Sequence, residues 1–169
     1  MPYKGYKYLI DSARFLNDSY VVLIGGGGPL KSKLREQIVE SGLQDKVKLL
    51  GFLGDEEVPA YFGACDLFCM SSVYATEAFG IVQIEAMSVG KPVVATKIPG
   101  SGVSWVNEHN VSGVNVKPKD SKALAIAFRH ILESPDTYSN YSEQASQRYW
   151  TMFTKTKMIE KCIDIYKNL

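Results

Sequence analysis

Short apolar runs rich in β-branched residues alternate along the chain with segments of helical pattern, and this alternation constrains the fold more than any other feature. The expected strands lie at 20–24, 47–50, 67–70, 92–95 and 113–116. The expected helices lie at 29–41, 57–63, 80–90 and 120–132, and the chain from Pro135 onward is expected to be helical to its end. Strands that alternate with helices indicate βαβ units and a parallel sheet. The predicted fold class is therefore α/β, with a Rossmann-like three-layer arrangement of one parallel sheet and helices on both faces.

The N-terminal region departs from this alternation. Residues 3–16 are typical of a loop and a helix, and no strand pattern comes before them. A doubly wound sheet normally opens with a strand, and that strand is usually central. Two explanations stay open: the chain begins one strand late, or its sheet closes differently. We favour the first.

Composition and charge narrow the class of protein. With 169 residues, the chain is expected to form a single globular domain that buries its own core. Hydrophobic residues make up 46% and charged residues 22%, which excludes a disordered, collagenous or coiled-coil chain. Nineteen Lys and Arg residues are balanced by 18 Asp and Glu residues, giving a net charge of +1. Nucleic-acid binding is disfavoured, because proteins that neutralise a phosphate backbone carry a basic excess.

The three cysteines, Cys65, Cys69 and Cys162, include no C-x-x-C pair, so neither a disulfide framework nor a zinc knuckle is indicated. They are expected to be small buried hydrophobes. No apolar stretch reaches the ~18 residues that span a bilayer, and the N-terminus lacks the apolar segment of a signal peptide. These features predict a cytoplasmic domain.

The segment 72–90 combines two acidic residues with a glycine at the start of a helix. Glu77 lies in the loop after an expected strand, and residues 80–82 would present unpaired backbone N–H groups, which bind anions. Glu85 lies about one turn further along and is expected to face the same cleft, where a carboxylate can accept ribose hydroxyls. The alternative is that both glutamates are merely solvated near a helix start.

The same segment resembles the E-x7-E signature of the retaining glycosyltransferases of the GT-B fold, in particular glycosyltransferase family 4. The matching residues run from Glu77 to Glu85 (EAFGIVQIE) and continue in GKPVVAT at 90–96. Further motifs of the donor-binding domain of that family follow the right order over residues 4–132. They are K-G, L-I and A within 4–13, a G-x-G-P-like loop at 24–29, F-x-G at 52–54, A-D-L-F at 64–68 and G-x-x-V-x-P-x-D at 113–120.

The resemblance implies the donor-binding half of an enzyme that transfers a hexose, mannose among the options, from a GDP-, UDP- or ADP-sugar to a glycan or lipid-linked acceptor. It implies no cofactor and no metal, and a need for an N-terminal acceptor-binding domain, without which this half is inactive. Residues 1–132 would form the donor-binding domain, and 133–169 would be helices that pack on it or toward the other domain. The full-length protein would be cytoplasmic and peripheral at the inner membrane face.

Carried over by position, the resemblance assigns roles to the motif residues. Glu77 would contact the transferred sugar and is the catalytic candidate, whereas Glu85 would hold the ribose. Lys4 would pair with the diphosphate, and the main chain at Leu53 would read the base. The complete donor-binding set is Lys4, Gly25, Gly26, Leu53, Glu77, Phe79, Gly80, Ile81, Val82 and Glu85.

Two features depart from the family pattern. The family places an arginine on a strand just before the loop of Lys4, and the chain begins after that position. Ser104 stands where the family usually has a glutamate, in the loop after the fourth expected strand. That loop therefore lacks the carboxylate that the family usually has there.

Other functions stay open. A stand-alone nucleotide-sugar-binding or interaction module would carry the same motifs without chemistry of its own. A GT-B sugar-nucleotide epimerase would rely on other acid and base residues, and the E-x7-E pattern argues against it. The glycines 25–28 fit a dinucleotide motif poorly, because Leu30 stands where its third glycine should be. No Gly-Lys-Ser/Thr follows them, which excludes a P-loop.

Aromatic residues and histidines outside these motifs are expected to be structural. Trp105 and Trp150 would fill gaps between layers, and His109 and His130 would be solvated or cap local structure. The C-terminal region is aromatic, and its surface is expected either to pack within the domain or to be an orphaned interface. Its aromatic residues are Tyr138, Tyr141, Tyr149, Phe153 and Tyr166.

Overall fold

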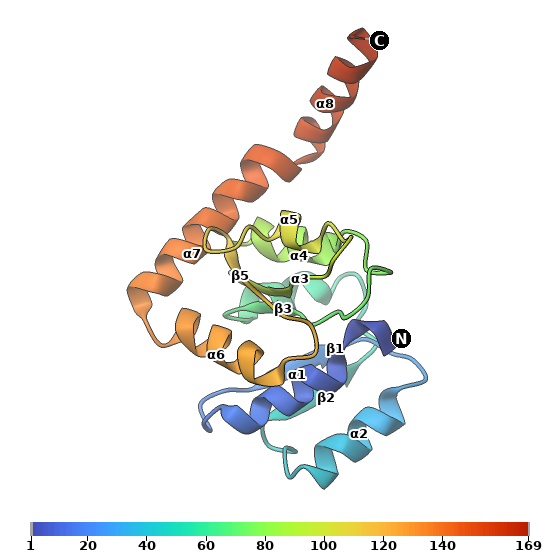
Figure 1. Cartoon of the computed structure of the whole chain (residues 1–169), viewed down its shortest axis with the longest axis vertical. Helices are drawn as coiled ribbons and strands as arrows, with labels where there is room; N and C mark the ends of the chain where they lie inside the picture. The colour runs from blue at the N-terminus through green and yellow to red at the C-terminus, as the bar shows by residue number, and fades with distance from the viewer. Residues whose placement is uncertain (1, 169) are drawn as a thin grey trace.

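The computed structural model describes residues 2–168 and confirms the α/β class (Figure 1). The described strands are β1 (Val22–Gly25), β2 (Val47–Gly51), β3 (Phe68–Met70), β4 (Val93–Thr96) and β5 (Gly113–Val116). The helices are α1 (Tyr6–Ser12), α2 (Lys31–Glu40), α3 (Val58–Ala64), α4 (Ile81–Ser88), α5 (Val103–Val106), α6 (Ser121–Leu132), α7 (Pro135–Arg148) and α8 (Lys155–Lys167). Short 3-10 segments η1 (Pro2–Lys4) and η2 (Ala13–Phe15) and a π-helical turn η3 (Tyr149–Phe153) complete the chain.

The predicted strands and helices are all present, with ends that shift by at most two residues. From Pro135 onward the described chain is helical as predicted, and it is divided into α7, η3 and α8. The chain leaves the helix at Thr154, whose backbone is extended and whose side chain accepts a hydrogen bond from the Lys157 N–H at 3.2 Å. A threonine in this role ends one helix and caps the next, because it satisfies a free N–H of the new helix. The short helix α5 was not predicted.

The sheet is interrupted, which corrects the prediction of one parallel sheet. β1 pairs with β2, and β3, β4 and β5 form a separate sheet in the order β3-β4-β5. Every pairing is parallel. Among residues 2–168, no ladder joins β1 to β3.

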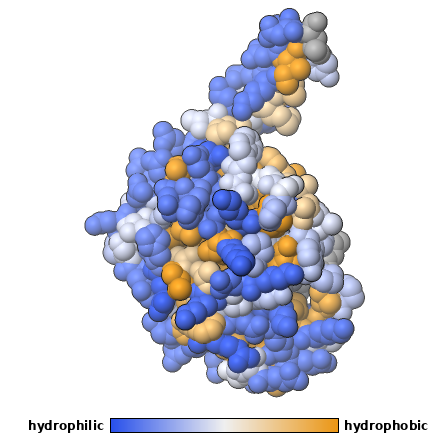
Figure 2. All heavy atoms as spheres, in the orientation of Figure 1, coloured by the Kyte–Doolittle hydropathy of each residue, from blue (hydrophilic) through white to orange (hydrophobic). Residues whose placement is uncertain are grey.

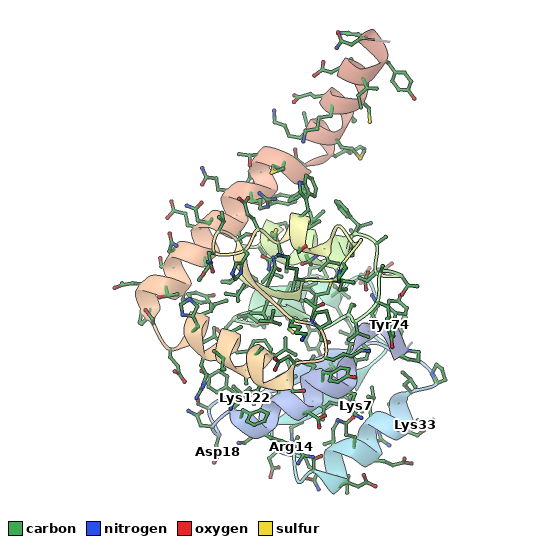
Figure 3. The ribbon with its side chains drawn as sticks, in the orientation of Figure 1. Lys7, Arg14, Asp18, Lys33, Tyr74 and Lys122 are labelled. Carbon is green, nitrogen blue, oxygen red and sulfur yellow. The ribbon has the colours of Figure 1, made fainter. Side chains whose placement is uncertain are left out.

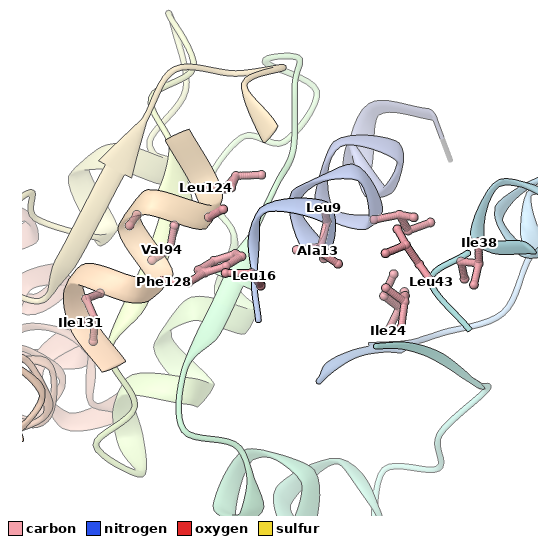
Figure 4. Close-up of a cluster of buried hydrophobic side chains, with 14 of the residues drawn as sticks. Leu9, Ala13, Leu16, Ile24, Ile38, Leu43, Val94, Leu124, Phe128 and Ile131 are labelled. Carbon is pink, nitrogen blue, oxygen red and sulfur yellow. The ribbon is translucent and has the colours of Figure 1, made fainter. Parts of the chain in front are cut away.

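Two apolar cores cover the opposite faces of the three-stranded sheet. Along β4, Val94 belongs to the core formed with α1 and α6, whereas Val93 and Ala95 belong to the core formed with α4 and α7. This alternation is expected of a buried strand, because successive side chains point to opposite faces. Figure 4 shows the first core, in which Leu9 and Phe128 contribute from α1 and α6, and which extends to Ile24 of β1.

The C-terminal helix α8 projects from the rest of the molecule (Figure 1). All of its residues except the half-buried Lys157 are exposed, including Cys162, which corrects the expectation that this cysteine is buried. Apolar side chains therefore reach the surface of this helix, as the orange spheres in Figure 2 show. They include Met158, Ile159, Ile163, Ile165 and Tyr166.

The aromatic C-terminal region is divided between the two roles expected for it. Tyr138 and Tyr141 pack with the first core, and Tyr149 and Phe153 pack against the second. Tyr166 is 79% exposed. None of the helices between residues 2 and 168 has the length and apolar character needed to cross a bilayer.

Gly113 lets β5 approach β4, because a Cβ added there would lie 1.8 Å from the carbonyl oxygen of Val93. We expect Gly113→Ala to lower the free energy of unfolding by roughly 1–3 kcal/mol or more, as overpacking does. Urea unfolding followed by circular dichroism measures this. Gly63→Ala is the control, because a Cβ at Gly63 in α3 meets open space. An equal loss in both variants would contradict the packing argument.

Candidate functional site

The N-terminal turn is bound to the carboxyl end of β3. The Ser71 hydroxyl donates to the carbonyl of Lys4 at 2.9 Å, and the Val73 N–H donates to the carbonyl of Tyr3 at 2.7 Å. Figure 3 shows Tyr74 beside this turn. Carboxyl ends of parallel strands are where open α/β sheets bind ligands. The turn therefore brings Lys4 to the edge of the sheet that is expected to carry the site.

Lys4 and Glu77 form an ion pair at this edge. The Lys4 Nζ lies 2.6 Å from the Glu77 Oε2, and the Ser72 hydroxyl donates to the same oxygen at 2.9 Å. Glu77 is only 9% exposed. Burial disfavours the charged form of Lys4, but the hydrogen bond and charge of Glu77 outweigh it, so the pKa of Lys4 is raised above its ordinary value. Lys4 and Glu77, which are each predicted to contact a ligand, thus contact each other directly.

The turn that leads into α4 is held by the loop after β4. The Ser101 hydroxyl donates to the carbonyl of Glu77, and the Gly102 N–H donates to the carbonyl of Ala78 at 2.7 Å. Gly102 has little room for a side chain, because an added Cβ would lie 3.0 Å from that same carbonyl oxygen. The position of the Glu77 backbone therefore depends on residues more than 20 positions further along the chain.

Gln83 holds the same turn from inside. It is fully buried, and its Nε2 donates to the carbonyls of Phe79 at 3.2 Å and Val103 at 3.4 Å. Gly80 adopts a left-handed backbone conformation with φ of 78° and caps α4. Within the described residues, the N–H groups of 80–82 have no backbone or side-chain acceptor. These donors are free for an anion, as predicted.

Glu85 differs from Glu77 in its surroundings. It is exposed and lies on the same side of α4 as Ile81, which is 66% exposed. No hydrogen bond or ion pair among residues 2–168 joins Glu85 to Glu77 or Lys4. A ligand that contacted both glutamates would have to extend from the turn along the first turns of α4.

The loops that follow β1 and β2 meet at the carboxyl ends of these two strands. The Gly26 N–H donates to the carbonyl of Gly51 at 2.6 Å. The Leu53 side chain packs on Gly25, where an added Cβ would lie 2.8 Å from the Leu53 Cδ1. Gly26 has a φ of 121°, a conformation that other residues rarely adopt. The predicted residues Gly25, Gly26 and Leu53 are thus brought together.

Phe79 turns its ring into an aromatic cluster. Its ring centroid lies 6.0 Å from that of Trp105 and 6.4 Å from that of Phe153. Trp105 is 52% and Trp150 62% exposed, so the expectation that both fill gaps between layers was wrong. They lie at the surface because α5 and η3 run along the outside of the second core.

The two histidines and Ser104 lie outside the polar contacts of Lys4 and Glu77. His109 accepts a hydrogen bond from the Asn115 N–H at 3.0 Å, which confirms its local structural role. His130 is exposed, with its ring edge-on to Tyr141. Ser104 contributes its carbonyl, which accepts from the Asn115 side chain at 3.4 Å.

Sequence reasoning missed four residues that shape the site: Ser72, Gln83, Ser101 and Gly102. Gln83 had a usable signal, because it is a polar residue within an apolar stretch, whereas Ser72 directly follows another serine. Ser101 and Gly102 had none, because their partners are distant in sequence. The residues between 2 and 168 contain no group of three or more His, Cys, Asp or Glu side chains that could hold a metal ion.

Comparison with known proteins gives a consistent result. The sequence profile of the family described as glycosyl transferases group 1 matches residues 1–148. The chain is 34% identical to O-antigen chain mannosyltransferase C of Escherichia coli over 167 residues, which are 99% of this chain and 44% of that protein. It is 34% identical over 152 residues to D-rhamnosyltransferase WbpZ of Pseudomonas aeruginosa, covering 90% of this chain and 39% of that protein.

Solved structures agree with these relatives. Anabaena HepE in complex with UDP superimposes with a TM-score of 0.90 at 30% identity, over 100% of this chain and 46% of that one. HepE in complex with UDP and glucose superimposes with a TM-score of 0.87 at 29% identity and the same coverage. The chain thus spans less than half the length of each of these proteins.

Replacing Lys4 tests the ion pair. We expect Lys4→Met to lower the free energy of unfolding by about 1–3 kcal/mol, because it leaves a buried carboxylate with one hydroxyl partner. Urea unfolding at pH 7.5 measures this, with Lys7→Met as control because Lys7 is exposed on α1 (Figure 3). Equal effects of the two substitutions would contradict the assignment.

The contribution of the Lys4–Glu77 ion pair to the free energy of unfolding depends on pH. The pKa of Lys4 is raised in the folded protein, so its contribution to stability is fully present below the pKa of the unfolded chain, ordinarily 10.5. The contribution is lost as the pH rises through the higher pKa of the folded state. The difference in unfolding free energy between the parent and Lys4→Met should therefore be constant from pH 7 to about 9 and shrink above about pH 10.5. A difference that grows at high pH would contradict this.

Proposed function

The chain belongs to the glycosyl transferases group 1 family, and from this we propose that it forms the donor-binding half of a retaining GT-B glycosyltransferase of family 4. The observation that carries the proposal is the Lys4–Glu77 pair beside the free N–H groups at the start of α4. It joins a cation, a buried carboxylate and an anion-binding turn at one edge of the sheet. A nucleoside diphosphate bound to a sugar offers a matching group to each of the three.

The cation and the helix N-terminus suit the leaving group. When the glycosidic bond to the diphosphate breaks, negative charge develops on the departing oxygen, and preorganised donors aimed at that charge stabilise the transition state. The turn that carries the N–H groups of 80–82 is held in place by the Gln83 side chain, which donates to the Phe79 carbonyl, and by the Gly102 N–H, which donates to the Ala78 carbonyl. Lys4 has three donors on its ammonium, so it can bind a phosphate oxygen while it keeps one hydrogen bond to Glu77.

Glu77 and Glu85 suit the two polyols of the donor. The carboxylate of Glu77 has an oxygen held by Lys4 and Ser72, which fixes its orientation for hydroxyls of the transferred sugar. Glu85 is exposed about one turn into α4 and is free to accept the two ribose hydroxyls. We assign the base to the main chain near Leu53, next to the glycines of the loop after β1.

The donor is a nucleoside-diphosphate hexose, with GDP, UDP and ADP as the candidate nucleotides. The names of two relatives, a mannosyltransferase and a rhamnosyltransferase, and the UDP-glucose complex of HepE support this class of donor. The acceptor is a glycan or lipid-linked sugar bound by a further domain, and the chain alone does not transfer sugar. Residues 1–132 form the donor-binding unit, and no cofactor or metal takes part. The full-length enzyme is cytoplasmic and peripheral to the membrane.

Calorimetric titration of the chain with GDP, UDP and ADP tests the site through Glu85. We expect one nucleotide to bind, and Glu85→Ala to weaken it by about 10- to 100-fold, because a charged acceptor of two hydroxyls is lost. Glu143→Ala is the control, since Glu143 is an exposed glutamate on α7. If Glu85→Ala binds as the parent does, the ribose assignment fails.

Glu77→Ala separates sugar binding from nucleotide binding. We expect this variant to bind the bare nucleotide within about threefold of the parent and to bind the matching nucleotide sugar at least tenfold more weakly, because only the sugar contacts Glu77. Circular dichroism checks that the variant is folded. Equal weakening for both ligands would show that Glu77 acts on the nucleotide or only on the structure of the loop.

A further inference from the structure

Arg148, the last residue of α7, is a charged residue that the proposed function does not use. Its side chain is only 11% exposed. Its Nε donates to the carbonyl of Val106 at 2.8 Å, and its Nη2 donates to the carbonyl of Trp105 at 2.6 Å. Its Nη1 forms an ion pair with Glu108. Three nitrogens of one planar guanidinium thus hold the end of α5 and the loop after it, in a fork geometry that a lysine does not reproduce.

Helix α5 depends on such outside donors because it is short. The last four carbonyls of a helix lack partners within it, and α5 has only four residues. The carbonyl of Ser104 accepts from the Asn115 side chain at 3.4 Å. Within the described residues, the carbonyls of Trp105 and Val106 have no donor other than Arg148. Removing the guanidinium therefore leaves both of these carbonyls without a donor in the protein.

The other end of α5 holds the turn that carries Glu77. The N–H of Gly102, the residue before α5, donates to the carbonyl of Ala78 at 2.7 Å. The Ser101 hydroxyl donates to the carbonyl of Glu77. The same hydroxyl accepts from the Val103 N–H at 3.2 Å, which joins the turn to the first residue of α5. A shift of α5 would therefore be passed to the backbone of Glu77 through these hydrogen bonds.

Aromatic rings connect the same segments a second time. The ring centroid of Phe153 in η3 lies 6.4 Å from that of Phe79, in the turn before α4, and 5.6 Å from that of Trp105 in α5. The guanidinium carbon of Arg148 lies 5.7 Å from the ring centroid of Phe153 and 5.9 Å from that of Trp105. A cation at this distance is attracted to the face of an aromatic ring. Arg148 therefore joins α7, η3 and α5 at the rings that contact the turn before α4.

We propose that Arg148 is a positioning residue for Glu77: it fixes α5, and α5 fixes the turn that presents the Glu77 carboxylate. This inference rests on the proposed function, because it takes Glu77 as the residue that contacts the transferred sugar. Arg148 itself touches no atom of the donor and acts only through the position of the turn. The N–H groups of 80–82, in contrast, lie at the start of α4 and are also held by Gln83. Loss of Arg148 should therefore weaken binding of the nucleotide sugar more than binding of the bare nucleotide.

Calorimetric titration with GDP, UDP and ADP, and with GDP-mannose, UDP-glucose and ADP-glucose, tests the proposal. We expect Arg148→Met to bind the bare nucleotide within about threefold of the parent and the matching nucleotide sugar about five- to tenfold more weakly, because the sugar contact is displaced. In the Glu77→Ala background, the same substitution should change nucleotide-sugar binding by less than about twofold, because the contact through which it acts is already absent. Arg35→Met is the matched control, since Arg35 is exposed on α2.

Amide hydrogen exchange without ligand, measured by nuclear magnetic resonance, tests the link from Arg148 to the turn separately. We expect Arg148→Met to speed exchange at the Gly102 N–H at least tenfold more than at the Leu124 N–H. The first donates to the Ala78 carbonyl of the turn, and the second donates to the Asp120 carbonyl at 3.1 Å in the core helix α6. If Arg148→Met does not fold, Arg148→Lys takes its place with the same expected directions, because one ammonium does not reproduce the fork that reaches both carbonyls.

Three results would overturn the proposal. The first is equal weakening of nucleotide and nucleotide sugar by Arg148→Met, or no weakening of either. The second is an effect on nucleotide-sugar binding that is as large in the Glu77→Ala background as in the parent. The third is exchange that speeds no more at Gly102 than at Leu124, since Arg148 would then support only the stability of the whole domain. If the parent binds neither nucleotide nor nucleotide sugar, the proposed function fails, and the exchange measurement alone decides whether Arg148 positions the turn.

Discussion

The close approach of the N-terminal turn to the end of β3 is the constraint on which the rest of the structure depends. Gly5 has a φ of 68° and lies against the Ser71 carbonyl, so no other residue fits there without moving the backbone. This contact sets where α1 begins and how it lies on the first core. It also carries Lys4 to within 2.6 Å of Glu77, 73 positions later in the chain.

Around this contact, the candidate site is built as a set of mutual restraints. Lys4 and Ser72 hold the side chain of Glu77, while Ser101 and Gly102 hold the backbone on either side of it. Gln83 fixes the turn at Gly80 from within the core. Such a site is preorganised, because hydrogen bonds within the protein hold its charges and N–H groups in position. Preorganised dipoles cost no reorganisation when charge develops in a reaction.

The interrupted sheet and the site are related. β1 and β3 each present an unpaired edge to a shared apolar cavity, and the loops that follow them carry the glycines and Glu77 of the candidate site. The first core crosses this interruption, since Ile24 of β1 and Val94 of β4 belong to the same cluster (Figure 4). Packing by α1 and α6 therefore holds together two sheets that backbone hydrogen bonds do not join. Unpaired edges of this kind attract another strand, because exposed N–H and C=O groups lack partners.

The local sequence pattern determined most of the secondary structure of this protein. The β-branched runs, the glycines that end them and the Asp120 cap of α6 predicted the strands and most helices, because each depends on neighbours in sequence. The free N–H groups at 80–82 followed in the same way from a glycine before a helix. Only the tertiary structure decided that Lys4 pairs with Glu77, that Ser101 and Gly102 support the turn, and that the sheet is divided. Those features depend on residues that are distant in sequence and on which edges meet, and no local pattern records such contacts.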